Sequence, residues 1–323
     1  MWRWIRLGGG VLILGVLLLR VGADPFVAGL RHTTPAAIGA AMAVTLVTTV
    51  CCAWRWSRVV GRLGVELPLP YAVAAYYRSQ FVNATLPGGV LGDVHRAVRH
   101  GRHAGRLGIG VRGVAWERGI GLVVYIAGAV AIALLTPSLR AFALVLGAVA
   151  VAVVLVVLAL RPLVRGSARW RQPLRSVSGD AREILGAGGL RWGLLLVSLV
   201  TAAGHTAIFV LAARTAGVVT PALELLPVAM VVLVGSTIPT NFAGWGPREA
   251  TAAGAFATVG LSAEQGVTVA VVYGVLALIA TLPGAVLLLV HRAPRVSQWS
   301  DTPGATQPVV GIDTVPVGGA AHG

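Results

Sequence analysis

Six apolar runs constrain the fold of this chain more than any other feature, because each is long enough, or nearly so, to cross a bilayer. A helix crosses about 30 Å of hydrocarbon with roughly 20 residues. Only 11% of the residues are charged, against about 25% in soluble domains. We therefore expect an all-α polytopic membrane protein with about six full transmembrane helices. The runs are approximately Leu7–Val21, Ala36–Trp54, Ile109–Leu135, Ala141–Leu160, Trp192–Ala213 and Ala263–Val290.

Two further apolar runs end at polar breaks. Tyr71–Leu86 leads into the break Asn83–Asp93, and Ala222–Ile238 leads into the break Ile238–Glu249. Both breaks hold proline, glycine, asparagine and charged residues. Lipid satisfies neither broken backbone nor a bare charge, so such segments are buried in protein or line a wet cavity. Intramembrane sites of this kind are where transporters bind substrate.

The arginines indicate whether these two runs cross the membrane or enter and return. The net charge of +15 comes from arginine, because the chain has no lysine. If each run crossed once, the clusters Arg96–Arg106 and Arg161–Arg191 would violate the positive-inside rule. If both runs return, nearly all loop arginines fall on the cytoplasmic side. We therefore expect two re-entrant hairpins and cytoplasmic termini in the cytoplasmic membrane. The exceptions on the outer side are then Arg20, Arg31, Arg140 and Arg214.

This topology predicts an inverted repeat. Each half holds three spans and one hairpin, and an odd number of spans inverts the second half relative to the first. Inverted repeats with broken helices are typical of secondary transporters. We expect a transmembrane domain over 1–292, with halves of about 1–137 and 138–292. The tail 293–323 is rich in Pro, Gly and Thr, and we expect it to be disordered and cytoplasmic.

The second break is the first candidate substrate site. Pro247 suits the first position of a helix, which we expect to run to about Val259. Its N-terminus favours an anion, and the guanidinium of Arg248 matches a phosphate. The alternative is that Arg248 and Glu249 pair only with buried partners. The candidate binding residues here are Asn241, Gly244, Gly246, Arg248 and Glu249.

The first break is the second candidate site. Asp93 precedes a short polar helix expected over Val94–His100, and Arg96 lies three residues later near the same face. Asn83 is expected to bond either the broken backbone or a ligand. The alternative for Asp93 is a structural role as the N-cap of the polar helix.

Two charged neighbours, Glu117 and Arg118, lie about two turns into the third span. Charges at that depth face the protein interior and pair there. Sequence neighbours do not face each other on a helix. We therefore expect Glu117 to pair with an arginine elsewhere, either Arg96 or Arg248, in a substrate-binding or a structural role.

The sequence also indicates several function classes that do not fit. Without lysine, the chain lacks the phosphate loop of an ATPase. Cys51 and Cys52 are adjacent, without metal or redox spacing. The arginines lie in short loops between apolar runs, where they meet lipid headgroups, so nucleic acid is not an expected partner. We find no catalytic set and expect no cofactor, no metal and no enzyme activity.

Three segments carry a resemblance to a known family. The runs NATLPGGVLGDVHR, VAWERGIGL and IPTNFAGWGPREATAAGAFATVGLS resemble the flippase-like transmembrane domain of lysylphosphatidylglycerol synthases, over nearly all of the chain to about Arg292. The resemblance implies lipid translocation by a stand-alone member without the aminoacyl-transferase domain. By the family's motif, it marks as functional Asn83, Pro87, Gly88, Asp93, Arg96, Glu117, Arg118, Pro239, Gly244, Gly246, Arg248 and Glu249.

The resulting hypothesis is an integral membrane lipid translocase. It would move a phospholipid or another lipid-linked phosphate headgroup, with the phosphate near Arg248 between the two hairpin tips. The expected partners are membrane lipids, whether anionic, aminoacylated or polyprenyl-linked, and possibly a separate cytosolic enzyme. The alternatives are a membrane-embedded component of a lipid aminoacyl- or glycosyl-transferase, and a non-catalytic membrane scaffold.

Overall fold

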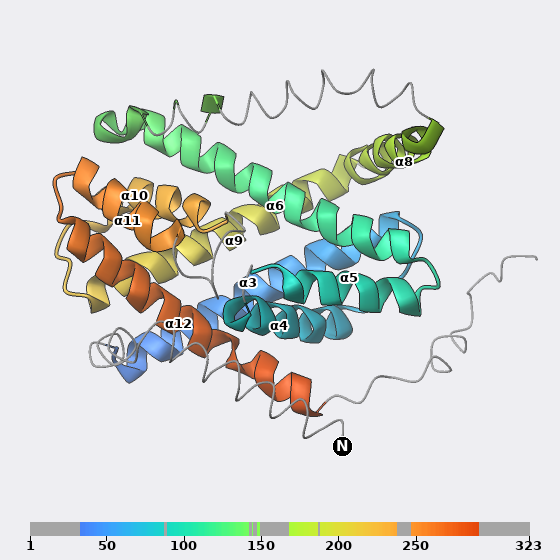
Figure 1. Cartoon of the computed structure of the whole chain (residues 1–323), viewed down its shortest axis with the longest axis horizontal. Helices are drawn as coiled ribbons and strands as arrows, with labels where there is room; N and C mark the ends of the chain where they lie inside the picture. The colour runs from blue at the N-terminus through green and yellow to red at the C-terminus, as the bar shows by residue number, and fades with distance from the viewer. Residues whose placement is uncertain are drawn as a thin grey trace, which may run out of the picture. The chain divides into compact units, whose positions relative to one another are not determined.

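The computed structural model describes residues 33–86, 89–141, 144, 147–148, 168–186, 188–237 and 247–290, except for the side chains of 168–175 (Figure 1). By contacts the chain divides into two units, Met1–Val290 and His291–Gly323. The second unit, with the predicted tail, lies outside the described residues. The predicted first span and most of the predicted fourth span also lie outside them.

Within the described residues all regular secondary structure is helical. Four helices are long and apolar enough to cross a membrane, namely α3, α6, α9 and α12. The chain is thus an all-α polytopic membrane protein, as predicted. The elements are α3 Pro35–Arg62, α4 Leu69–Thr85, α5 Leu91–His103, α6 Leu107–Leu135, the 3₁₀ turn η1 Pro137–Leu139, α8 Ala168–Leu185, α9 Gly188–Thr215, α10 Ala222–Gly235, α11 Pro247–Thr258 and α12 Ala263–Val290.

Local sequence signals fix several helix ends. The hydroxyl of Thr34 accepts a bond from the backbone N–H of Ala37 at 3.2 Å, ahead of α3. Before α12, Ser262 and Gln265 form a reciprocal capping box, with bonds of 3.0 Å and 3.3 Å. The sequence predicted this cap and both ends of α12.

Helix α3 extends past its predicted end. The apolar run stops at Trp54, because Arg55 and further arginines lower the hydropathy there. The helix nevertheless continues to Arg62, and Trp56 and Val60 on its inner face are completely buried. The end of α3 is therefore indicated by the helical spacing of its buried residues and not by mean hydropathy. As a result, Arg55 lies inside a spanning helix instead of in a loop.

The described helices form two sets with the same order of lengths: α3–α6 and α9–α12 each run long, short, short, long. Contacts repeat between the sets. Helix α3 packs on α9, α4 packs on α12, and α10 correspondingly packs on α6. Within the sets, α5 packs on α6 and α11 packs on α12 (Figure 1). The inversion of one half and the re-entry of the hairpins stay predictions.

Glycines bring the short helices close to their neighbours. A Cβ at Gly92 would collide with the backbone carbonyl of Ser79, so α5 meets α4 backbone to backbone. A Cβ at Gly110 would likewise collide with the carbonyl of Ala97, where α6 meets α5. Small residues at helix contacts allow this approach in membranes. The two contacts bring the polar residues of α4, α5 and α6 within bonding distance.

Candidate functional site

The carboxylate of Glu117 is the centre of a charged cluster inside the first set of helices. Glu117 lies on α6 and is completely buried. Its Oε1 accepts from Nη2 of Arg55 on α3 at 2.6 Å, and its Oε2 accepts from Nη2 of Arg96 on α5 at 3.1 Å. The hydroxyl of Tyr76 on α4 also donates to Oε1 at 3.3 Å. A buried carboxylate requires such partners, and here four helices supply the group and its donors.

The second carboxylate of the cluster belongs to Asp93 on α5. One oxygen accepts from the hydroxyl of Ser79 at 2.9 Å and from Arg96 at 3.0 Å. The other accepts from the amide of Asn83 at 3.1 Å and from Arg118 at 2.7 Å. Burial acts to raise the pKa of Asp93, but the charges of Arg118 and Arg96 outweigh burial and hold that pKa at about 2. The carboxylate is therefore ionised at neutral pH.

The guanidinium of Arg96 joins both carboxylates through one nitrogen. Its carbon lies 4.5 Å from the ring centroid of Trp56 and 4.3 Å from that of Tyr76, so the cation is within cation–π distance of both rings. Among the described residues, Nε and Nη1 of Arg96 and Nε1 of Trp56 have no hydrogen-bond partner, although all three are buried. A buried donor without an acceptor is costly by about 1–3 kcal/mol. These donors would therefore be stabilised by an acceptor such as water or a ligand oxygen.

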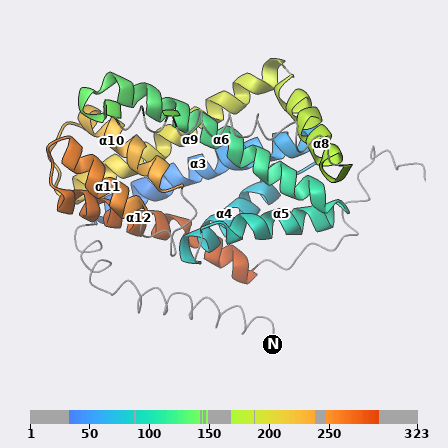
Figure 2. The ribbon, with the colours of Figure 1, turned by 45° about the horizontal axis from the view of Figure 1, so that its top comes forward.

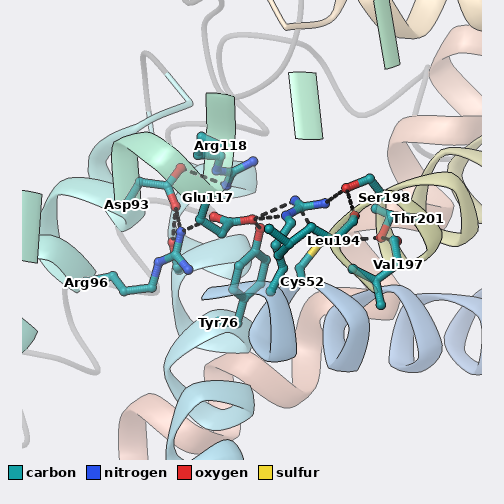
Figure 3. Close-up of polar contacts among 12 residues, drawn as sticks. Cys52, Tyr76, Asp93, Arg96, Glu117, Arg118, Leu194, Val197, Ser198 and Thr201 are labelled. Carbon is teal, nitrogen blue, oxygen red and sulfur yellow. Dashed lines mark hydrogen bonds and ion pairs between the residues drawn. The ribbon is translucent and has the colours of Figure 1, made fainter. Parts of the chain in front are cut away.

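On its other side the cluster reaches the second set of helices. Nη1 of Arg55 donates to the hydroxyl of Ser198 on α9 at 2.9 Å, and Ser198 donates to the carbonyl of Leu194 at 2.6 Å. Figure 3 shows Glu117 between the Asp93 and Arg96 side chains and those of α9. The network thus connects α9 to α3, α4, α5 and α6.

Arg118 is the exposed member of the cluster. Its side chain is 47% exposed, whereas that of Glu117, the preceding residue, is 0% exposed. Arg118 lies eleven residues after Leu107, the first residue of α6, which is about 16 Å along the axis at 1.5 Å per residue. The cluster as a whole holds three guanidinium groups and two carboxylates, so its net charge is +1.

The charged residues of the second break form a separate, local pair. Nη2 of Arg248 lies 2.7 Å from Oε1 of Glu249, and both residues are in the first turn of α11. The guanidinium lies 5.5 Å from the ring centroid of Tyr273 on α12. Next to it, Gly274 leaves room, since a Cβ there would lie 2.5 Å from Nη2 of Arg248. The pairing agrees with the structural alternative for these two residues and leaves their predicted binding role a prediction.

The structure brings together every predicted residue of the first break and the third span that it describes. Arg96 is confirmed as a partner of Glu117. The N-cap interpretation of Asp93 is wrong, because α5 begins earlier, at Leu91, and Asp93 lies in its first turn. Asn83 bonds the broken backbone, accepting from the N–H of Gly92 at 2.7 Å. The predicted residues outside the described part are Pro87, Gly88, Pro239, Asn241, Gly244 and Gly246.

Several members of the cluster were missed from sequence. Arg55 was assigned to a loop, because the apolar run ended one residue before it. Tyr76 and Ser79 are ordinary members of an apolar run, with no spacing that marks them. A signal for Arg55 did exist, since Cys52, Arg55 and the buried Val59 follow the helical spacing of i, i+3 and i+7.

The chemistry available to this cluster is charge-assisted binding. Guanidinium groups bind phosphate and carboxylate through paired N–H donors, and ionised carboxylates hold those guanidinium groups in place. In the part of the chain that the structure describes, no three His, Cys, Asp or Glu side chains are grouped as a metal site would require. The geometry is thus suited to recognising a charged group at the middle of a spanning helix.

Comparison with known proteins identifies the family. The family model described as "Lysylphosphatidylglycerol synthase TM region" matches residues 3–284, which include both breaks, the spans α3, α6 and α9, and most of α12. No curated protein and no solved structure matches the chain. A match over most of the length, on a helical membrane fold, makes this a multi-pass membrane protein related to lipid metabolism. The chain belongs to the family of lysylphosphatidylglycerol synthase TM regions.

Proposed function

We propose that this protein is a lipid translocase that carries an anionic phospholipid headgroup, or another lipid-linked phosphate, across the cytoplasmic membrane. Membership of a lipid-related membrane family supports the class of substrate. The charged cluster supports the chemistry, because three guanidinium groups outnumber two carboxylates in it. A phosphodiester carries one negative charge and would neutralise the excess.

The observation that carries this proposal is the position of Arg118. A charged side chain near the middle of a spanning helix is expensive in lipid and faces protein or water. Arg118 is nevertheless 47% exposed, while Asp93, with which it forms a salt bridge, is 13% exposed. An exposed guanidinium at this depth, oriented by a fixed carboxylate, is suited to meet a headgroup that enters from the side of the bilayer.

Buried hydrogen-bond donors support the same assignment. Nη1 and Nε of Arg96 and Nε1 of Trp56 are donors and lack acceptors among the described residues. Phosphate oxygens are acceptors only, so a headgroup near Arg118 would match this set of donors. We therefore place the phosphate at Arg118 and Arg96. Arg248 is less suited as the first contact, because Glu249 already bonds its guanidinium.

We also propose that the cluster transports and does not catalyse a reaction. Its members bind through charge and hydrogen bonds, and translocation requires no covalent step. Rocking of the α4–α5 hairpin against α6 would expose Arg118 to each leaflet in turn. Transporters with broken helices move in a comparable way. Cytoplasmic termini, argued from the arginine distribution, place α5 and its arginines towards the cytoplasm.

The test is a leaflet-exchange assay in proteoliposomes with a fluorescent phosphatidylglycerol and an impermeant quencher. Arg118→Gln should slow exchange about tenfold to a hundredfold, since a hydrogen bond to a charged group is worth roughly 1.5–3 kcal/mol. Arg112→Gln is the matched control. Arg112 is also on α6, but it pairs with Asp180 at 3.0 Å, outside the cluster. Its exchange rate should stay near that of the unmodified protein.

Equal rates for the two variants would exclude Arg118 from the transport step. Arg248→Gln provides the third comparison, because the sequence alone points to Arg248. A large loss for Arg248→Gln with none for Arg118→Gln would move the headgroup to the second break. Absence of exchange for every phospholipid, in protein that is folded and inserted, would reject translocation itself.

A further inference from the structure

Helix α8 was not predicted as an element and plays no part in the proposed transport step. Its sequence has two stripes at helical spacing. The apolar stripe repeats every three or four residues, and the arginines of the basic stripe are four and seven residues apart. Side chains of 168–175 are placed here by register alone. The apolar stripe consists of Trp170, Leu174, Val177, Ala181 and Leu185, and the basic stripe of Arg171, Arg175 and Arg182.

A third edge of α8 is fixed to the protein. Asp180 is buried, and its Oδ2 accepts from Nε1 of Trp116 at 3.3 Å and lies 3.0 Å from Nε of Arg112. One turn later, Ile184 is completely buried, in a cluster with Val59 of α3 and residues of α9. The helix is therefore docked along one edge against α3, α6 and α9.

The apolar stripe of α8 is exposed at positions 177 and 185, where its side chains are described. Val177 is 46% exposed and Leu185 is 47% exposed. Arg182, in the basic stripe, is also exposed. A helix docked along one edge, with an open apolar face beside a basic face, has the pattern of an interfacial amphipathic helix.

The position of α8 along the chain agrees with this pattern. Helix α8 ends at Leu185, and the spanning helix α9 begins at Gly188. The connection is too short for α8 to leave the membrane boundary, because each residue spans at most about 3.6 Å. Figure 2 shows the chain turning sharply between the two helices. Its C-terminal end therefore lies where α9 enters the bilayer.

We propose that α8 is an interfacial helix that binds anionic phospholipid at the membrane surface. Its apolar stripe lies at the level of the first acyl carbons, and its arginines bind lipid phosphates. Charge complementarity selects this occupant, because the stripe next to the apolar face is basic and lipid phosphates are negative. The same α8 is tied through Asp180 to Trp116, the residue before Glu117. Anionic lipid is thereby gathered beside α6, whether or not it is later moved across.

The first test measures depth. With both native cysteines replaced by serine, single cysteines at Val177 and at Glu183 carry a nitroxide, and the protein is reconstituted in vesicles of phosphatidylglycerol and phosphatidylcholine. Glu183 is exposed and lies about 120° around the helix from Val177, at 100° per residue. The label at 177 should collide mainly with oxygen and the label at 183 mainly with a water-soluble nickel complex. Equal water access at both positions would overturn the proposal.

The second test measures lipid preference. A fluorophore at position 177 is quenched by brominated phosphatidylglycerol or brominated phosphatidylcholine, and the two quenching curves give the local preference. Each arginine removed should lower the preference for phosphatidylglycerol roughly fivefold, by the usual attraction of one basic residue to an anionic surface. The change Arg171→Gln, Arg175→Gln and Arg182→Gln should therefore abolish it, and lysines at the same positions should keep it.

Other outcomes distinguish the alternatives. An unchanged preference in the glutamine variant would overturn the binding of anionic lipid by α8. Efficient cross-linking between cysteines at 177 in two copies would assign the apolar stripe to a second copy of the chain and overturn the lipid assignment. None of these readouts depends on transport, so the proposed function and this inference stand or fall separately.

Discussion

Two regions of this protein each bury an arginine beside a carboxylate, and they do so differently. Around Glu117, the partners Arg55 and Arg96 come from separate helices, and the carboxylate is completely buried. In the second break, Arg248 pairs with the residue next to it, Glu249, whose side chain is 15% exposed. The first arrangement joins residues of separate helices, whereas the second joins neighbouring residues of one helix. Because the partners of Glu117 come from separate helices, the packing of those helices fixes the position of its charge.

The two regions nevertheless share a structural device. Each arginine lies over a glycine of the last long helix in its set, Arg55 over Gly121 of α6 and Arg248 over Gly274 of α12. In both sets, a glycine of the last long helix allows a guanidinium to lie close to the helix backbone. They differ in the carboxylate that bonds the guanidinium: for Arg55 it lies on another helix, and for Arg248 it belongs to the next residue.

The largest expected difference between the two regions is the loss of stability when the carboxylate of each, Glu117 or Glu249, is replaced by an amide. Glu117→Gln leaves Arg55 buried without its counter-charge and leaves Arg96 with Asp93 alone, which should be destabilising by about 3–5 kcal/mol. Glu249→Gln should lower stability less, because its pair is closer to solvent. Thermal unfolding of detergent-purified protein, followed by size-exclusion, measures both changes. Adding Arg55→Gln to Glu117→Gln should restore part of the loss. Equal losses for both carboxylates would contradict the distinction drawn here.

An intermediate difference is expected at the two glycines. Gly121→Ala places a Cβ 2.6 Å from Nη2 of Arg55, which Glu117 and Ser198 hold in place. Overpacking of this kind is destabilising by about 1–3 kcal/mol. Gly274→Ala should be less destabilising, since the pair of Arg248 and Glu249 is closer to solvent than the pair of Arg55 and Glu117.

The matched control for both glycines is Gly119→Ala. A Cβ at Gly119 would have nothing within 4 Å, so alanine should stabilise α6 by up to about 1 kcal/mol. The same thermal assay compares all three variants. A greater loss for Gly274→Ala than for Gly121→Ala would show that Arg248 is the more tightly held arginine.

The smallest expected difference concerns pH and involves His100, which meets Trp56 edge-on with ring centroids 5.4 Å apart. Burial, and then the charges of His103 and Arg96, lower the pKa of His100 to about 4. In the unfolded chain His100 takes up a proton near pH 6.5, whereas in the folded chain it does so only near pH 4. Stability should therefore fall as pH decreases across that window.

His100→Gln removes this contribution, so the thermal midpoint of the variant should decline less on acidification from pH 6.5 to pH 4.5. The substitution leaves every residue of the charged cluster in place. If the thermal midpoints of the variant and the unmodified protein fell in parallel with pH, the protonation of His100 would not affect stability, and this prediction would be wrong.

Much of the fold could be read from the sequence, and part of the site as well. The apolar runs predicted six spans, and four of them are the described helices α3, α6, α9 and α12. The capping box at Ser262 predicted the start of α12. Asp93, Arg96 and Glu117 were marked because a charge at membrane depth requires a partner. Arg55 was missed because hydropathy averages over a window, and three arginines ended that window early. Ser198 was missed because nothing local distinguishes a hydroxyl that bonds a distant guanidinium.

The sequence by itself determined that this chain is a helical membrane protein with broken, charged segments, because hydrophobic length and backbone chemistry act locally. The tertiary structure alone decided which charges meet. Arg55 and Glu117 are 62 residues apart, and nothing in either neighbourhood encodes the other. Their contact depends on where α3, α5 and α6 cross, and small residues such as Gly92 and Gly110 set those crossings through packing.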